Sequence, residues 1–219
     1  SNELRIMRCV RHPNIVLFHG AYISDNKLSL VLERVTGQPL SAFVQCQQRS
    51  LPQSWEQRLI SGITSSIWYL HVFEPCIVHG DLKPTNILVE MKLLEPLDGN
   101  APLRSPHAKL IDFGLSRLLS KHPKPLGGTR AWCAPEVYMN GNIPRPSADV
   151  FSLGCTLFFI VTKRPPFKMS LRNVSSSGEM PSLPWSGFDS MSTQPFAATT
   201  EFRQLLGKCV CFDAAARPS

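Results

Sequence analysis

The strongest structural signal in this chain is a helical repeat of apolar residues between positions 59 and 70. The repeat has the i, i+3/i+4, i+7 spacing of one helix face and consists of Leu59, Ile60, Ile63, Ile67 and Leu70. Ser54 followed by Gln57 is typical of a capping box, so we expect this helix to begin at Ser54. A second apolar run, 150–161, is shorter than the about 20 residues that span a bilayer. It indicates a buried helix capped by Ser147.

The composition is that of an ordinary globular chain. Its 219 residues suffice for one domain with a sizeable core, and 43% hydrophobic residues argue against global disorder. The net charge of +7 comes from scattered basic residues, so we expect no nucleic-acid partner. No secretory signal opens the sequence, and its seven cysteines are an odd number. We therefore expect reduced thiols, a cytoplasmic location and no membrane segment in this chain.

Shorter elements are expected around the two helices. Further helices are expected over 3–10, 40–44 and 201–211. A turn at 24–26 should join two strands, 15–18 and 28–32, into a hairpin, and short strands are expected at 77–78, 87–89 and 109–111. The polar residues 90–107 and the Ser-, Met- and Pro-rich residues 168–198 are expected to be loops. This order predicts a small β portion followed by a helical body.

Three polar segments carry the chemistry of the chain. Residues 78–86 read Val-His-Gly-Asp-Leu-Lys-Pro-Thr-Asn, residues 112–114 read Asp-Phe-Gly, and residues 134–136 read Ala-Pro-Glu. In this order they resemble the catalytic loop, the metal-binding triplet and the end of the activation segment of eukaryotic protein kinases. The resemblance extends from Glu3 to Arg217.

The resemblance implies a fold and a reaction. The fold would be the α+β, bilobal protein-kinase fold, with residues 1–35 as a partial β N-lobe from helix C to the hinge and 36–219 as the α-helical C-lobe. The reaction would be transfer of the γ-phosphoryl group of ATP, with Mg²⁺, to serine or threonine hydroxyls of a protein substrate. The lysine of Asp-Leu-Lys-Pro-x-Asn indicates a serine/threonine kinase, and Gly128-Thr129 agrees.

The resemblance also assigns catalytic residues. Asp81 would accept or orient the proton of the substrate hydroxyl, and Lys83 would neutralise charge that develops on the γ-phosphate. Asn86 and Asp112 would hold Mg²⁺, which prefers oxygen ligands. Thr129 would hydrogen-bond Asp81 and Lys83.

The nucleotide site is carried over in the same way. Leu32 would be the gatekeeper, Glu33 and Val35 would offer backbone groups to adenine, and Leu88 would lie under the purine. Plain core packing explains Leu32 and Leu88 equally well. Glu3 stands where the family has its helix-C glutamate, which pairs with a strand lysine that grips the α- and β-phosphates.

Several structural features of the family are also expected here. A hydrophobic column should contain Met7, Phe18, His79 and Phe113. Asp149 should anchor the loop of His79, and Glu136 should pair with Arg217. Residues 11–16 and 128–132 resemble the tyrosine kinase-like group, which includes Raf-like and mixed-lineage kinases.

Two departures from the family pattern stand out. The sequence contains neither a glycine-rich loop nor the preceding strand lysine, and we expect both to lie before Ser1 in a longer protein. Gly80 replaces the arginine of His-Arg-Asp, which in many kinases binds a phosphorylated activation segment. We therefore expect activity that does not depend on phosphorylation of Ser116, Ser120 or Thr129. A catalytically inactive kinase-homology module that binds partners is the alternative.

Overall fold

The computed structural model describes residues 2–25, 27–48, 50–94, 103–118, 131–139, 143–166, 183 and 199–219. Its helices are α1 (Asn2–Cys9), α2 (Leu40–Cys46), α3 (Gln53–His71), α4 (Pro135–Tyr138), α5 (Pro146–Thr162) and α6 (Thr200–Cys209). Its strands are β1 (Phe18–Ser24), β2 (Lys27–Leu32), β3 (Gln38–Pro39), β4 (Ile77–Val78), β5 (Ile87–Leu94), β6 (Leu103–Leu110) and β7 (Arg117–Leu118). Within the described residues, 3₁₀ turns cover Pro84–Asn86 and Ala214–Ala216.

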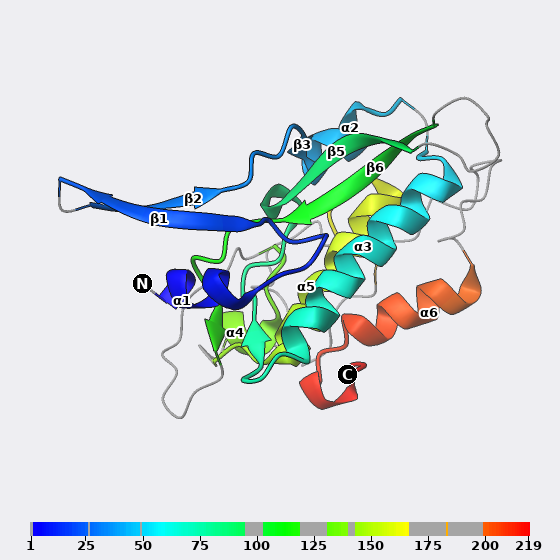
Figure 1. The fold of residues 1–219 in the computed structure, drawn as a ribbon. Helices are drawn as coiled ribbons and strands as arrows, with labels where there is room; N and C mark the ends of the chain where they lie inside the picture. Colours follow the sequence, from blue (N-terminus) through cyan, green and yellow to red (C-terminus); the bar gives the residue numbers. More distant parts are fainter. Residues whose placement is uncertain are drawn as a thin grey trace.

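The helical body is built on the two predicted helices. α3 lies beside α5, and α6 packs on the outer side of the pair (Figure 1). The repeat on α3 is buried at Leu59, Ile63, Ile67 and Leu70. The side chains of α5 from Phe151 to Val161 are buried on all sides, which explains why its apolar run shows no helical period.

Both predicted serine caps are wrong. α3 begins one residue before Ser54, with Pro52 as its N-cap and no side-chain cap. The N–H groups of Trp55 and Glu56 donate instead to the Pro52 carbonyl oxygen at 2.9 and 3.1 Å. α5 begins at Pro146, and Ser147 lies inside it. Proline at the first helical position has the helical φ and lacks the N–H that a cap would satisfy.

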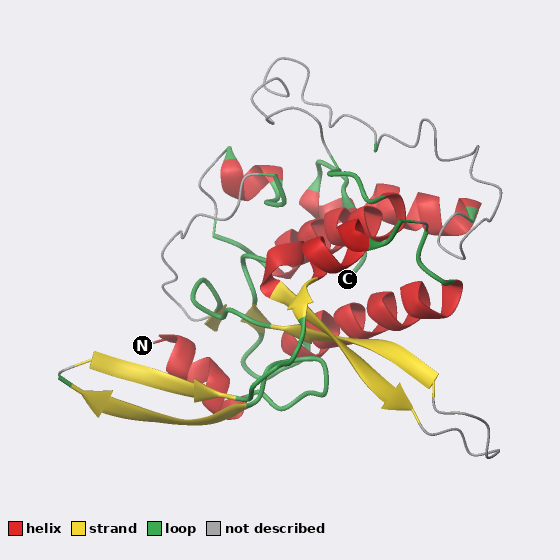
Figure 2. Ribbon diagram, turned by 90° about the horizontal axis from the view of Figure 1, so that it is seen from above, coloured by secondary structure: helices red, strands yellow, loops and turns green. Residues whose placement is uncertain are grey.

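In the described part of the chain, small antiparallel sheets accompany the helices: β1-β2, β3-β5-β6 and β4-β7. The β1-β2 and β5-β6 hairpins extend in different directions from the body (Figure 2). The first hairpin begins at Phe18 rather than at Ile15. Val16 donates its N–H to the Leu110 carbonyl oxygen at 3.0 Å, and Ile15 forms a bridge with Leu110, so this segment belongs beside β6. These sheets and the helical body confirm the α+β class.

The loop predicted over 90–107 is wrong in the residues that the structure describes. β5 continues to Leu94, and β6 runs from Leu103, with Glu90 opposite His107 in the register. The apolar residues Ile87, Val89, Ala108 and Leu110 share the buried face of this hairpin. Their alternation supports a strand even though the intervening residues are polar. The predicted loop 168–198 lies outside the described residues apart from Leu183.

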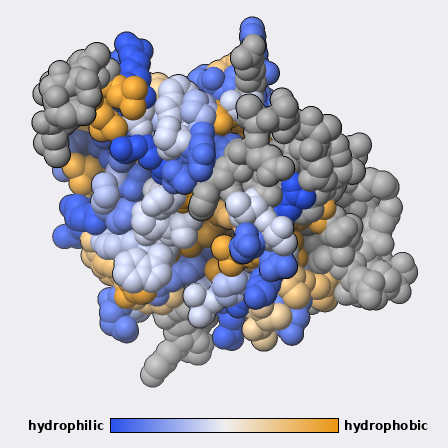
Figure 3. Space-filling view, turned by 90° about the vertical axis from the view of Figure 1, so that its right-hand side faces the viewer, coloured by the Kyte–Doolittle hydropathy of each residue, from blue (hydrophilic) through white to orange (hydrophobic). Residues whose placement is uncertain are grey.

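The surface and the cysteines complete the description. None of the helices in the described part of the chain is both long and apolar enough to cross a membrane. On the face drawn in Figure 3, hydrophobic residues emerge in several separate areas among hydrophilic ones. All seven cysteines are free thiols, as expected.

Candidate active site

A buried aspartate holds the backbone of the loop that follows β4. Asp149, on α5, is 1% exposed and accepts the N–H groups of His79 and Gly80 at 2.8 and 2.9 Å. His71 Nε2 lies 3.0 Å from the same carboxylate. Because α5 is fixed in the core, these bonds give the loop one conformation, and the predicted anchoring role of Asp149 is confirmed.

Three of the predicted catalytic side chains meet in this loop. Lys83 Nζ lies 2.6 Å from Asp81 Oδ2. Asn86 Nδ2 donates to the Asp81 carbonyl oxygen at 2.9 Å and to Oδ2 at 3.1 Å. The ammonium of Lys83 and the amide of Asn86 together fix the orientation of the Asp81 carboxylate. Thr129, the fourth predicted catalytic residue, lies outside the described residues.

A backbone hydrogen bond brings Asp112 to the same loop. The Ile111 N–H donates to the Asn86 carbonyl oxygen at 2.9 Å. Asp112 has a φ of +64°, in the left-handed region that few non-glycine residues adopt, and its Oδ1 accepts the Gly114 N–H at 3.1 Å. Strained backbone of this kind is typical of functional sites.

Two members of the predicted hydrophobic column, Phe113 and His79, contact each other beside these residues. The ring of Phe113 is 1% exposed and meets the His79 ring edge-on, with centroids 5.2 Å apart. Burial lowers the pKa of His79 although the nearby Asp149 acts in the opposite direction. His79 is therefore a neutral packing residue rather than a proton carrier. Met7 is also buried, at 2% exposed, and Phe18 packs against the core.

Glu3 approaches Asp112 from α1. Burial and then the negative charge of Asp112 raise the pKa of Glu3. The charge of Asp112 can act on Glu3 in this way because the two side chains lie near each other. This is consistent with the predicted place of Glu3 at the phosphate end of the nucleotide.

The residues predicted to hold Mg²⁺ suit that ion by their chemistry. Asn86 uses Nδ2 for its bonds to Asp81, so its Oδ1 is the atom directed elsewhere. Together with the carboxylate of Asp112 it offers the hard oxygen ligands that Mg²⁺ prefers. In the described part of the chain no three His, Cys, Asp or Glu side chains form a metal cluster. Two protein ligands fit an ion that is held jointly with substrate phosphates.

The predicted adenine-binding residues lie on the strands around the segment 32–35. Leu32, at the end of β2, is 38% exposed, and Val35 packs against the core. The Glu33 N–H donates to the Leu17 carbonyl oxygen at 2.8 Å. Leu88 lies on β5 opposite Pro39 and Lys109. Their contact with a purine stays a prediction.

Gly80 has the conformation that its residue type favours. Its φ is +79°, and a Cβ atom at this position would lie 3.1 Å from the Leu115 carbonyl oxygen. Next to it, Ser116 is 1% exposed and donates its hydroxyl to the His79 carbonyl oxygen at 2.9 Å. Ser116 is therefore a buried structural residue in this conformation, and the sequence had offered it as a phosphorylation candidate. Ser120 lies outside the described residues.

The predicted ion pair of the helical body is confirmed. Arg217 Nη1 and Nη2 donate to the two carboxylate oxygens of Glu136 at 2.7 and 2.8 Å. The guanidinium also lies over the ring of Phe151, 5.1 Å from its centroid. The pair ties the Ala-Pro-Glu segment to the C-terminal end of the described chain.

Comparison with known proteins agrees with this geometry. A family model described as the protein kinase domain matches residues 1–219. The chain belongs to the protein kinase family. This kinase domain is 38% identical to the serine/threonine-protein kinase RUNKEL of Arabidopsis thaliana over 75% of the chain and 11% of that protein.

Other relatives of this kinase domain carry similar names. It is 35% identical to death-associated protein kinase 2 of Mus musculus over 76% of the chain and 42% of that protein. It is 29% identical to the mitogen-activated protein kinase kinase kinase YODA of Arabidopsis thaliana over 100% of the chain and 22% of that protein. The chain thus spans less than half the length of these relatives.

Proposed function

We propose that this kinase domain transfers the γ-phosphoryl group of ATP to serine or threonine hydroxyls of proteins. The observation that carries the proposal is the hydrogen-bonded set of Asp81, Lys83 and Asn86, to which the Ile111–Asn86 bond adds Asp112. Phosphoryl transfer requires mainly an oriented hydroxyl and charge stabilisation, and this set can provide both.

The proposed roles follow from the chemistry of each group. The substrate hydroxyl oxygen forms a bond to the γ-phosphorus as the bond to the ADP oxygen breaks. Asp81 receives the hydroxyl proton, and Lys83 offsets the negative charge on the transferred group. Asn86 and Asp112 hold Mg²⁺, which neutralises phosphate charge when bound. Glu33, whose N–H is engaged by Leu17, offers its carbonyl oxygen to adenine.

The choice of acceptor rests on the names of the relatives and on two motif residues. The relatives reported above are named a serine/threonine-protein kinase, a mitogen-activated protein kinase kinase kinase and a death-associated protein kinase. Lys83 and Thr129 stand where serine/threonine kinases have them. Seven free thiols support a reducing compartment for this domain.

The first experiment measures phosphate incorporation from γ-labelled ATP into casein by the intact protein. We expect Asp81→Asn to lower kcat by at least about 100-fold, because a positioned general base contributes about 10²–10⁴ in rate. Asp25→Asn, in the exposed β1-β2 turn, is the matched control and should leave the rate unchanged. Equal incorporation by Asp81→Asn and wild type would rule out Asp81 as the base. No incorporation by wild type would favour the inactive, partner-binding alternative.

We also propose that activity does not require phosphorylation between Asp112 and Glu136. Gly80 has no side chain to bind a phosphate, and the hydroxyl of Ser116 is buried. Treatment of the purified protein with a phosphatase, followed by removal of the phosphatase, should change the rate less than twofold. A loss of tenfold or more would contradict this mode of regulation.

A further inference from the structure

A buried lysine on β6 connects two parts of the proposed nucleotide site. Lys109 is 8% exposed. Its Nζ lies 2.5 Å from Glu33 Oε1 and 3.5 Å from the Ile15 carbonyl oxygen. Removing an ammonium from water costs several kcal/mol unless it is paired, so these two contacts fix where Lys109 can lie.

The partners of Lys109 belong to the adenine side of the site. Glu33 follows β2 in the segment proposed to bind the purine. Ile15 lies in the segment that runs alongside β6, where Leu110 donates its N–H to Asn14 at 2.8 Å and accepts that of Val16 at 3.0 Å. Lys109 therefore ties the Glu33 side chain, in the segment proposed to bind the purine, to the backbone of Ile15.

The C-terminal end of β6, where Lys109 lies, also leads to the metal side. Asp112 is three residues beyond Lys109, and the intervening Ile111 donates its N–H to the Asn86 carbonyl oxygen. The backbone between Lys109 and Asp112 is thus bonded on one side to residues 14–16 and on the other to the catalytic loop. A change in the position of Lys109 relative to Glu33 changes the separation between the purine segment and the magnesium ligands.

We propose that Lys109 is a positioning residue that sets this separation by its ion pair with Glu33. The inference rests on the proposed function, since it concerns a ligand that contacts both ends of the site at once. A nucleoside diphosphate with Mg²⁺ contacts both the purine segment and the magnesium ligands, whereas adenosine contacts only the purine segment. Loss of the ion pair should therefore weaken the binding of the nucleoside diphosphate with Mg²⁺ and leave the binding of adenosine unchanged.

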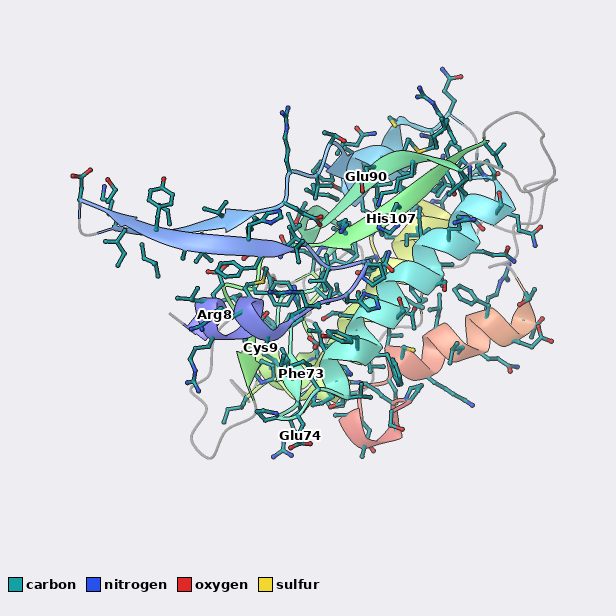
Figure 4. The ribbon with its side chains drawn as sticks, in the orientation of Figure 1. Arg8, Cys9, Phe73, Glu74, Glu90 and His107 are labelled. Carbon is teal, nitrogen blue, oxygen red and sulfur yellow. The ribbon has the colours of Figure 1, made fainter. Side chains whose placement is uncertain are left out.

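Charge alone does not distinguish Lys109 from its neighbours. The face of the hairpin that carries Lys109 also carries Glu90 and His107, which are labelled on β5 and β6 in Figure 4. Lys92 lies on this face too, and its Nζ is 3.2 Å from Glu90 Oε1. The Lys92 side chain is 48% exposed against 10% for Lys109. Lys92→Met is therefore a control that removes a lysine of the same sheet whose ion pair is with Glu90 and whose charge acts on Glu33 without an ion pair to it.

The experiment measures binding of Mg²⁺·ADP and of adenosine to the intact protein by calorimetry. For Lys109→Met we expect about tenfold weaker Mg²⁺·ADP binding and adenosine binding within twofold of wild type. Lys109→Arg retains a cation opposite Glu33 and should restore Mg²⁺·ADP binding to within threefold. Lys92→Met should bind both ligands as wild type does.

The outcomes separate this inference from the proposed function. If wild type itself does not bind Mg²⁺·ADP, the proposed function fails. If wild type binds it and Lys109→Met binds it equally well, the positioning role fails. If Lys109→Met weakens the binding of Mg²⁺·ADP and of adenosine equally, Lys109 has a general structural role, and this result would also overturn the inference. Thermal unfolding of each variant shows whether it is folded. If Lys109→Met is not folded, the double variant with Lys109→Glu and Glu33→Lys, which reverses the ion pair, takes its place in the binding experiment.

Discussion

Replacing Glu56 by glutamine should stabilise the domain at alkaline pH and leave it unchanged at acidic pH. Glu56 is on α3, is 0% exposed, and neither carboxylate oxygen has a hydrogen-bond partner among the described residues. Burial raises its pKa from an ordinary 4.5 to about 8. The folded protein therefore keeps a proton on Glu56 at a pH where the unfolded chain releases it.

The magnitude follows from proton linkage. Since the folded pKa is the higher one, the contribution of Glu56 to stability is fully present below pH 4.5 and is lost as the pH rises to about 8. The folded and unfolded pKa values of Glu56 differ by 8 − 4.5 = 3.5. At about 1.4 kcal/mol for each pKa unit, ionised Glu56 lowers the free energy of unfolding by at most about 5 kcal/mol above pH 8. At pH 7 the loss is about 3 kcal/mol.

Urea unfolding at pH 5, 7 and 9 measures this effect. The free energy of unfolding of Glu56→Gln should equal that of wild type within about 1 kcal/mol at pH 5 and exceed it by several kcal/mol at pH 9. Glu201→Gln, at an exposed position in the first turn of α6, should show the same difference from wild type at all three values. A gap between Glu56→Gln and wild type that does not change with pH would refute the reasoning.

Three further predictions concern stability. Gly80→Ala should destabilise the domain by about 1–2 kcal/mol, the usual cost of a side chain in the left-handed region; Gly207→Ala, where a Cβ meets nothing within 4 Å, should instead stabilise α6 by up to about 1 kcal/mol. Thermal unfolding measures both, and a neutral Gly80→Ala would contradict the strain argument. Glu136→Gln should cost about 3–5 kcal/mol, because the Arg217 side chain, 0% exposed, stays buried without its partner. A urea midpoint near that of wild type would show that this pair acts like a surface ion pair.

The helical part of the fold was predictable because its signals are local and strong. The period of α3 and the unbroken apolar run of α5 each determine an element without reference to the rest of the chain. Their first residues were not predictable from the serines, because Pro52 is the N-cap of α3 and Pro146, after the N-cap Arg145, is the first residue of α5. Helix boundaries depend on such competition within one turn.

The β5-β6 hairpin shows what a local reading misses. The residues after Val89 look like a loop because Glu90, Lys92 and His107 are polar. Only pairing across the hairpin places them on one face and Met91, Pro106 and Ala108 on the other. Strand partners distant in the sequence are not visible from composition.

In the candidate site, too, some residues could be predicted from the sequence and another could not. Asp81, Lys83, Asn86 and Asp112 could be proposed from the sequence because their motifs are short and ordered. Lys109 was missed because a lysine in a strand gives no sign of burial. The signal that could have found it is its place beside Leu110 and Ala108 at the end of an apolar strand that leads into Asp112.

The most direct test of the convergence of these residues is the effect of Mg²⁺ on ADP affinity in the intact protein. We predict that Mg²⁺ tightens ADP binding at least about tenfold in wild type, a difference of about 1.4 kcal/mol, and that Asp112→Asn and Asn86→Ala each abolish the tightening. An equal effect of Mg²⁺ in wild type and both variants would contradict the account.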